Sequence, residues 1–68
     1  MDRVNVGSSN IRSIGYENNV LEVEFLNNSI YQYYNVEIYH FDNLITKPHP
    51  GTYFSKFIKD KYLFIRVF

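Results

Sequence analysis

The sequence predicts one small α+β domain, residues 1–68, in which an antiparallel sheet packs against two short helices. Apolar and polar residues alternate in several segments before Asn35, as in half-buried strands. After Asn35 the apolar residues recur every three to four positions, as in amphipathic helices, and alternation returns near the C-terminus. The expected strands lie at about 9–16, 20–26, 29–35 and 62–68, and the expected helices at about 36–46 and 52–61.

The first expected strand is the segment from Ser9 to Tyr16. Strict alternation places Ile11 and Ser13 on one face of it, and Arg12, Ile14 and Tyr16 on the other. The polar run Glu17-Asn18-Asn19 then turns the chain. In the next strand Leu21, Val23 and Phe25 oppose Glu22 and Glu24, which is the pattern of a strand with one buried face.

The turn at Asn27-Asn28 decides which way the following tyrosines face. A two-residue loop would put Tyr31 and Tyr33 on the face of the glutamates, because the side-chain period of a strand is two. A three-residue loop from Leu26 to Asn28, with Asn28 left-handed, pairs Val23 with Tyr31 and Leu21 with Tyr33. We prefer the second register because it leaves no amide or carboxylate facing the core, where an unpaired polar group costs about 1–3 kcal/mol.

Two helices are expected between Asn35 and the last strand. Asn35 can cap the first helix, whose apolar stripe is Ile38, Phe41, Leu44 and Ile45. The segment from Lys47 to Gly51 must end it, since each proline disfavours helical geometry in the residue before it. Thr52 can cap the second helix, with Tyr53, Phe54, Phe57 and Ile58 facing inward.

Charge is divided unevenly along the chain. Residues 1–42 hold two arginines and six carboxylates, whereas residues 43–68 hold five basic residues and one carboxylate. The total is zero, and a protein that binds long duplex nucleic acid normally carries a clear positive excess. Long duplex DNA is therefore disfavoured as a partner.

Several classes of protein are disfavoured by what the chain lacks. It holds no cysteine, so neither a disulfide framework nor a thiolate metal site can form, and a cytoplasmic location is expected. The segment Met1–Asn5 lacks the features of a signal peptide, and no apolar run approaches the roughly 18 residues of a membrane span. We expect no membrane contact, no metal and no cofactor.

The candidate catalytic groups are weak. His40 and His49 lack the spacing of metal ligands, and nothing in the sequence sets a histidine beside Ser8-Ser9. The pair Glu22 and Glu24 fits a solvated strand face better than an acid/base pair. We expect no enzymatic activity and rank a small hydrolase last among the functions.

A set of short motifs spans nearly the whole chain. It consists of Ser8-Ser9-Asn10-Ile11, Ile14-Gly15-Tyr16, Leu21 to Phe25, Tyr31-Gln32-Tyr33, Val36, Gly51 with Tyr53-Phe54, Ile58, Tyr62 and Arg66-Val67. In these motifs the chain resembles the KTSC domain, a module named after its occurrence at the C-terminus of some lysyl-tRNA synthetases. Asn28, Glu37 and His49 depart from the pattern, which commonly has glycine, proline and serine there.

The KTSC resemblance implies more about occurrence than about chemistry. Such domains also occur as free-standing proteins in bacteria and their phages, so a phage-encoded member would act in the cytoplasm of the bacterial host. RNA binding is the function usually suggested for the family, and no catalytic residues are associated with it. The serine before Pro-Gly is replaced by His49, which leaves ligand binding through that loop in question.

The surplus of aromatic rings is the main functional signal. Seven Tyr and six Phe are more than so small an interior can hide, although Tyr31, Tyr33, Tyr53 and Tyr62 can also be core rings. Stacking of a base on an aromatic ring stabilises a complex by about 1–3 kcal/mol. Lys56 and Lys59 share a helix face, and Lys61 and Arg66 follow. The candidate ligand-binding residues are Ser9, Asn10, Arg12, Tyr31, Tyr33, Tyr53, Lys56 and Arg66.

The residues permit two main functions. The first is a non-catalytic module for a small nucleotide or a short single-stranded RNA, and zero net charge favours the small nucleotide. A homo-oligomer could enclose such a ligand between protomers, as a phage protein that sequesters a nucleotide signal of host defence would. The alternative is a protein–protein interaction module without a nucleotide ligand, with Ile30 and Tyr34 as its contact patch.

Overall fold

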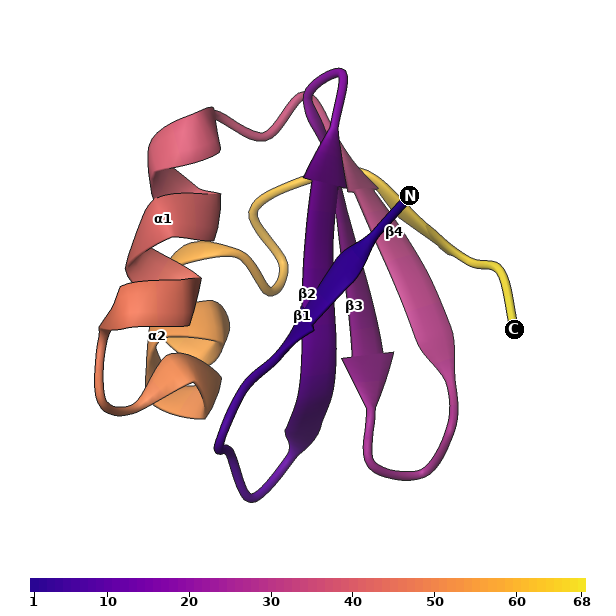
Figure 1. The fold of residues 1–68 in the computed structure, drawn as a ribbon. Helices are drawn as coiled ribbons and strands as arrows, with labels where there is room; N and C mark the ends of the chain where they lie inside the picture. The colour runs from indigo at the N-terminus through magenta and orange to yellow at the C-terminus, as the bar shows by residue number, and fades with distance from the viewer.

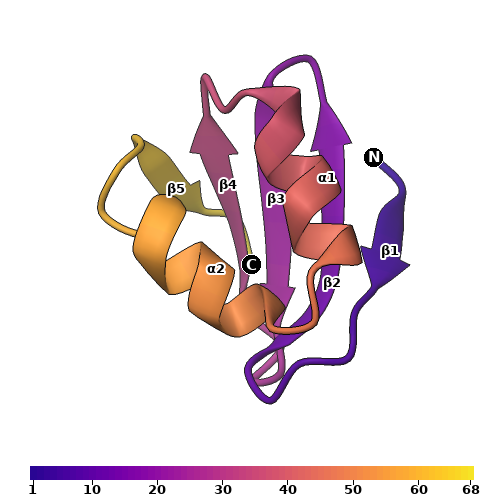
Figure 2. The ribbon, with the colours of Figure 1, turned by 90° about the vertical axis from the view of Figure 1, so that its left-hand side faces the viewer.

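The computed structural model describes all residues from Met1 to Phe68 and confirms the α+β class. Five strands form one sheet in chain order, with every neighbouring pair antiparallel. Both helices lie on the same face of this sheet (Figures 1 and 2). The elements are β1 (Arg3–Asn5), β2 (Ile11–Glu17), β3 (Val20–Phe25), β4 (Ile30–Tyr34), α1 (Ile38–Thr46), α2 (Pro50–Phe57) and β5 (Phe64–Arg66).

Asparagines form the turns of both central hairpins. Asn18 and Asn19, with φ of 52° and 66°, make the two-residue turn between β2 and β3. Asparagine tolerates this left-handed region better than most residues. Asn28 has φ of 73° in the three-residue loop between β3 and β4. Val23 therefore lies opposite Tyr31 and Leu21 opposite Tyr33, which confirms the expected register and sets both tyrosines on the helix side.

The expected alternation along β2 is wrong at its start. The pairing with β3 shifts between Ile11 and Ser13, so the strand contains a bulge at Arg12. A bulge inserts one extra residue and re-aims the side chains that follow it. As a result Ile11 and Ile14, expected on opposite faces, are both buried in the core, and Ser13 lies with the glutamates of β3.

The helices are confirmed, but their ends and faces need correction. Asn35 adopts a left-handed conformation with φ of 60°, and Glu37 is the residue at the N-cap of α1. His40 and Leu44 are buried in α1, whereas Ile38 and Ile45 are exposed. Helix α2 begins at Pro50 rather than at Thr52 and ends at Phe57 rather than at residue 61. Proline suits the first position of a helix because that residue needs no N–H donor there.

The outer face of the sheet is closed by polar side chains rather than by a helix. Strand β1, which the sequence patterns did not predict, pairs with β2 and carries Arg3 over Gly15 to Glu22 and Glu24. A Cβ on Gly15 would lie 2.7 Å from the Asp2 carbonyl oxygen and 3.0 Å from Cγ of Arg3, so only glycine leaves room for this crossing. Glu22 also accepts a hydrogen bond from Gln32 at 2.8 Å, and it is only 8% exposed.

The hydrophobic core lies between the sheet and the helices. Residue types with branched or aromatic side chains dominate it: Ile11, Ile14, Leu21, Val23, Tyr33, Val36, Leu44, Phe54 and Ile58. Tyr16 packs against this core, and its hydroxyl donates to the Val36 carbonyl at 2.6 Å. The last strand covers Phe64–Arg66 and is shorter than the expected 62–68. Tyr62 lies before it, and the Tyr62 hydroxyl donates to Glu37 at 2.7 Å.

Candidate ligand-binding site

The larger pocket opens at one end of the sheet, between the loop before β2, the β3–β4 hairpin and the C-terminal end of α2. Its volume is about 630 Å³. Aromatic rings form the apolar part of its wall, and hydroxyl, amide and charged groups form the rest. The lining residues are Ser9, Asn10, Ile11, Phe25, Leu26, Asn27, Ser29, Tyr31, Tyr33, Gly51, Phe54, Ser55, Lys59, Asp60 and Phe64.

The five rings of this pocket hold one another in place. Phe54 meets Phe25 and Tyr33 edge to face, with ring centroids 5.6 and 5.3 Å apart. Tyr31 stacks beside Tyr33 at 6.4 Å, and Phe64 lies 5.8 and 5.5 Å from these two tyrosines. Such contacts stabilise a ring cluster beyond the area it buries. The result is a rigid aromatic wall that comes from β3, β4, α2 and β5.

Tyr33 and Phe54 are the most deeply buried rings of the wall, each with 5% of its surface exposed. Burial, together with the nearby Tyr31 and the charge of Asp60, raises the pKa of the Tyr33 hydroxyl to about 12. The phenol is therefore neutral at physiological pH, where it can donate a hydrogen bond as well as accept one. Tyr31 is only half-buried and offers part of its ring to the pocket.

A second pocket of about 510 Å³ lies at the N-terminal end of α2 and has no hydrophobic lining residue. It is bounded by the Gly7–Asn10 loop and by the start of α2. The Ser8 hydroxyl shapes this loop, because its oxygen accepts from the backbone N–H groups of Asn10 at 3.2 Å and Ile11 at 3.3 Å. A Cβ on Gly51 would lie 3.2 Å from that oxygen, so glycine lets the loop approach the helix closely.

The two pockets adjoin. Ser9, Asn10, Gly51 and Ser55 line both of them. Lys56 lies on the polar pocket, while Lys59 and Asp60 lie on the aromatic one. The first helical turn of α2 has free backbone N–H groups and a positive dipole end, which favour an anion in the polar pocket. One continuous hollow therefore combines flat apolar walls with polar donors.

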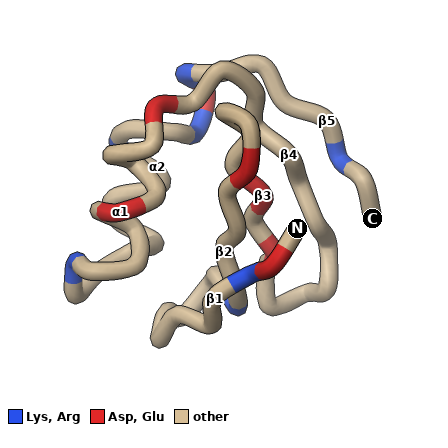
Figure 3. The backbone as a smooth tube through the Cα atoms, turned by 45° about the horizontal axis from the view of Figure 1, so that its top comes forward, with Lys and Arg blue, Asp and Glu red and all other residues tan.

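The structure brings five of the eight expected site residues to this hollow. Ser9 and Asn10 line both pockets, Tyr31 and Tyr33 line the aromatic one, and Lys56 lines the polar one. The other three lie elsewhere. The basic residues as a group are spread over the loop after α1, α2 and the turn after it, and the strands β1, β2 and β5, rather than gathered in one patch (Figure 3).

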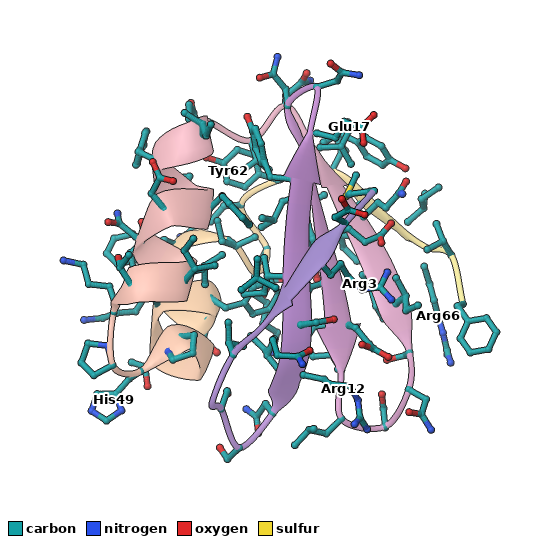
Figure 4. The ribbon with its side chains drawn as sticks, in the orientation of Figure 1. Arg3, Arg12, Glu17, His49, Tyr62 and Arg66 are labelled. Carbon is teal, nitrogen blue, oxygen red and sulfur yellow. The ribbon has the colours of Figure 1, made fainter.

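Arg12 lies at the bulge of β2, beside the β3–β4 hairpin (Figure 4). Its guanidinium group is within 3.8 Å of Glu24 and donates to the Leu26 carbonyl at 3.4 Å. Arg66 lies on β5, at the edge of the sheet, and donates from Nε to the Phe68 carbonyl at 2.8 Å (Figure 4). Both arginines are thus held by the chain itself, outside either pocket.

Tyr53 lies between the two helices. Asn43 donates to its hydroxyl at 2.9 Å, and that hydroxyl lies 2.8 Å from Nδ1 of His40. Since a hydroxyl has one proton and two lone pairs, the tautomer of His40 decides whether Tyr53 donates to Nδ1 or accepts from it. Burial lowers the pKa of His40, although the nearby Glu37 opposes this shift. This cluster joins α1 to α2 and is separate from the hollow.

Sequence patterns missed several lining residues, notably Phe25, Phe54 and Phe64. The sequence placed each of them in a strand or helix. Which rings meet, however, depends on the pairing of β4 with β5, two strands that α1 and α2 separate in the sequence. Ser55 was expected to face water, and it does, at the boundary of the two pockets.

No group of three His, Asp or Glu side chains is placed to hold a metal ion. Neither helix is long and apolar enough to cross a membrane.

The fold and the hollow together define a small α+β domain with a single antiparallel sheet in chain order and a composite pocket at one end of it. A sequence profile of the KTSC domain matches residues 7–62. The chain therefore belongs to the KTSC domain family. A crystal structure of a KTSC domain protein from Yersinia pestis is similar, with a TM-score of 0.93 and 35% sequence identity over 98% of this chain and 97% of that one. A comparison with curated proteins gave no match.

Proposed function

We propose that the domain binds a nucleotide-type ligand without catalysing a reaction on it. The observation that carries this proposal is the direct connection between an aromatic pocket and a polar pocket. A base is flat and stacks on rings, and a phosphate needs N–H, hydroxyl and ammonium donors. A ligand that has both parts would lie across Ser9, Asn10, Gly51 and Ser55, which the two pockets share.

In this proposal the base stacks on the ring of Tyr31, at one end of the aromatic wall. Tyr31 is half-buried, and its ring is braced by Phe25, Tyr33 and Phe64 at 5.6 to 6.4 Å. Because the wall is already ordered, stacking on it costs little side-chain entropy. Polar groups at the rim, from Asn10, Asn27 and Ser29, could then bond to the edge of the base.

The polar pocket supports the phosphate. Lys56 and the first turn of α2 supply positive charge there, and Lys59 lies at the neighbouring pocket. The chain as a whole is neutral, which favours a small nucleotide or a short RNA over a long polymer. Sequestration of a small nucleotide signal, as a phage protein that counters host defence would perform it, is the cellular function that fits a binding domain without catalytic groups.

The test is a substitution that fills the junction of the pockets. We expect Ser55→Trp to weaken binding of AMP and of the dinucleotide pApA by at least about tenfold, since the indole would occupy the space of the sugar and phosphate. Ser55 is exposed, so the fold should survive. Thr46→Trp, at an exposed position on α1 away from both pockets, is the matched control.

Isothermal titration calorimetry with AMP, pApA, cyclic dinucleotides and inorganic phosphate measures this effect. Binding that weakens steeply with added salt would support phosphate contacts. Absence of heat and of thermal stabilisation across the whole panel would refute the nucleotide proposal. Recovery of every nucleotide intact after long incubation would support the non-catalytic part, and conversion of any of them would contradict it.

A protein-interaction function is the second candidate, and one observation favours it. Ile30 and Tyr34 are half-buried on the outer face of β4, beside the exposed apolar residues of β5. Contiguous apolar surface of this kind marks interaction sites. This candidate predicts binding that hardly responds to salt.

A further inference from the structure

The edge strand β5 is unusual in its composition and exposure. Leu63, Phe64, Ile65, Val67 and Phe68 are all exposed, with Leu63 at 79% and Ile65 at 54%. Edge strands of stable monomers are normally protected by charges, prolines or bulges. Each edge strand carries one charge, Arg3 on β1 and Arg66 on β5, but the other residues of β5 and those beside it are apolar and exposed.

The backbone of β5 has one side free for pairing. The Leu63 carbonyl accepts from the N–H of Tyr34, and the Val67 N–H donates to the Ile30 carbonyl, so these two residues turn their backbone groups toward β4. Ile65, which lies opposite Gln32, belongs to the same series. By the alternation of an antiparallel ladder, Phe64 and Arg66 then turn their N–H and C=O groups outward.

We propose that two copies of this chain pair through their β5 edges, antiparallel and with the two-fold axis at Ile65. The partner strand must present the same free groups, and in this register Phe64 of each copy exchanges hydrogen bonds with Arg66 of the other. Ile65 then lies opposite the second Ile65, and Leu63 lies opposite the second Val67. Each side chain of the exposed apolar row on the outer face then gains an apolar neighbour from the other copy.

Charge selects this register over its neighbours. An axis at Arg66 would place two guanidinium groups directly opposite each other, and like charges in that position are destabilising. An axis at Phe64 would pair Arg66 with Tyr62, which lies outside the strand. Only the axis at Ile65 uses all three strand residues and sets each Arg66 against an aromatic ring, where a cation is attracted.

The pairing completes the candidate site from the second copy. Phe64 lines the aromatic pocket and lies opposite Tyr33 on the helix side of the sheet. The second copy's Arg66 would lie on that same side, next to Phe64, at the rim of the pocket. It would add a guanidinium group to a rim that otherwise has Lys59 and Asp60 as its charges. This part of the inference rests on the proposed function, whereas the pairing does not.

The pairing is tested by sedimentation velocity on the full chain over a range of concentrations. The interface is small, so we expect a dimer that dissociates on dilution. Ile65→Lys should give a monomer at every concentration, because two ammonium groups would face each other across the axis. Ile38→Lys, at a position that is 58% exposed on α1, should leave the dimer unchanged. A monomeric wild-type chain, or a dimer that survives Ile65→Lys, would overturn the pairing.

The contribution of Arg66 to the second copy's pocket is tested by mixing two defective variants. In a mixed dimer, the Arg66→Gln copy supplies an unobstructed pocket, and the Ser55→Trp copy supplies the Arg66 that would reach that pocket. If Arg66 acts across the dimer, each variant alone should bind pApA about tenfold more weakly, and the mixture should regain wild-type affinity at up to one site in each mixed dimer. No recovery in the mixture would show that Arg66 does not act across the dimer. A dimer that binds no nucleotide would remove the proposed function and leave the pairing intact.

Discussion

At the scale of single residues, the outer face of the sheet depends on one arginine that crosses a glycine. Burial by itself raises the pKa of Glu22, but hydrogen bonds from Gln32 and Arg3, and the charge of Arg3, hold that pKa below its ordinary value. A buried carboxylate that stays ionised needs such partners, since burying an unpaired charge costs free energy. Arg3 therefore stabilises β1 and the central strand β3 together.

We expect Arg3→Ala to lower the free energy of unfolding by about 1–3 kcal/mol at neutral pH, because Glu22 loses its charged partner. The folded pKa of Glu22 is lowered, so its stabilising contribution is present above pH 4.5 and is lost as the pH falls below it. Urea unfolding at pH 7 and at pH 3 measures the difference. A deficit in Arg3→Ala that is equally large at both pH values would contradict this account.

At the scale of secondary-structure elements, the β3–β4 hairpin shows how a turn sets the faces of its strands. Asn28 closes the three-residue loop with its N–H donating to the Phe25 carbonyl at 3.0 Å. Its left-handed backbone is what keeps Tyr31 and Tyr33 on the helix side. A loop one residue shorter would turn both rings to the other face and dismantle the aromatic pocket.

Substitutions of Asn28 should follow backbone conformation rather than side-chain size. We expect Asn28→Gly to change the free energy of unfolding by less than about 0.5 kcal/mol or to raise it, since glycine adopts a positive φ freely. Asn28→Val should lower it by about 1–2 kcal/mol, because a β-branched residue is strained there. Thermal unfolding of the two variants decides the point, and equal loss in both would argue against a left-handed turn.

Sequence patterns recovered the elements that repeat a simple period. The register of β3 against β4 followed from polarity alone, because only one register puts the tyrosines on the core face and the glutamates on the opposite face of the sheet. The bulge at Arg12 was missed since nothing local in Ile11-Arg12-Ser13 announces an extra residue. Strand β1 was missed because it is three residues long and exposed, and its pairing depends on contacts that Gly15 permits.

The helix faces were harder to predict because tertiary contacts overrode polarity. Ile38 and Ile45 are exposed, whereas His40 is 5% exposed and bonded to Tyr53, so a polar residue took an interior position by finding a partner. The candidate site was predicted in part. Its members near the chain's Ser-Ser-Asn and Tyr-x-Tyr motifs were found, but the pairing of two pockets around Ser55 depends on how α2 meets the loop before β2.

At the scale of the whole molecule, the titratable groups with shifted pKa values set two limits on stability. Burial lowers the pKa of His40, and the hydrogen bond from Tyr62 lowers the pKa of Glu37. A lowered pKa gives a contribution that is lost as the pH falls. Burial raises the pKa of Tyr33 to about 12, and the bond to Glu37 raises that of Tyr62 to about 12, so their contributions are lost as the pH rises.

We therefore expect the free energy of unfolding to be nearly constant between about pH 7 and pH 10 and to decline on both sides. The acid decline should begin near pH 6.5, where an unfolded histidine gains its proton and the buried one resists it. Urea unfolding at steps of half a pH unit measures the profile. His40→Gln should delay the acid decline until the carboxylates titrate, below about pH 4.5, and an unchanged onset in that variant would exclude His40 as the cause.

The sheet of this domain runs in the same order as the chain, so all but one of its strand pairs join neighbouring segments. Only the contact of β5 with β4 must wait for the two intervening helices, and closing a long loop is the slow part of forming a sheet. The first four strands can therefore assemble as they emerge, while the last three-residue strand docks at the end. During synthesis on the ribosome, the aromatic wall and the free edge would both come into being in that final step.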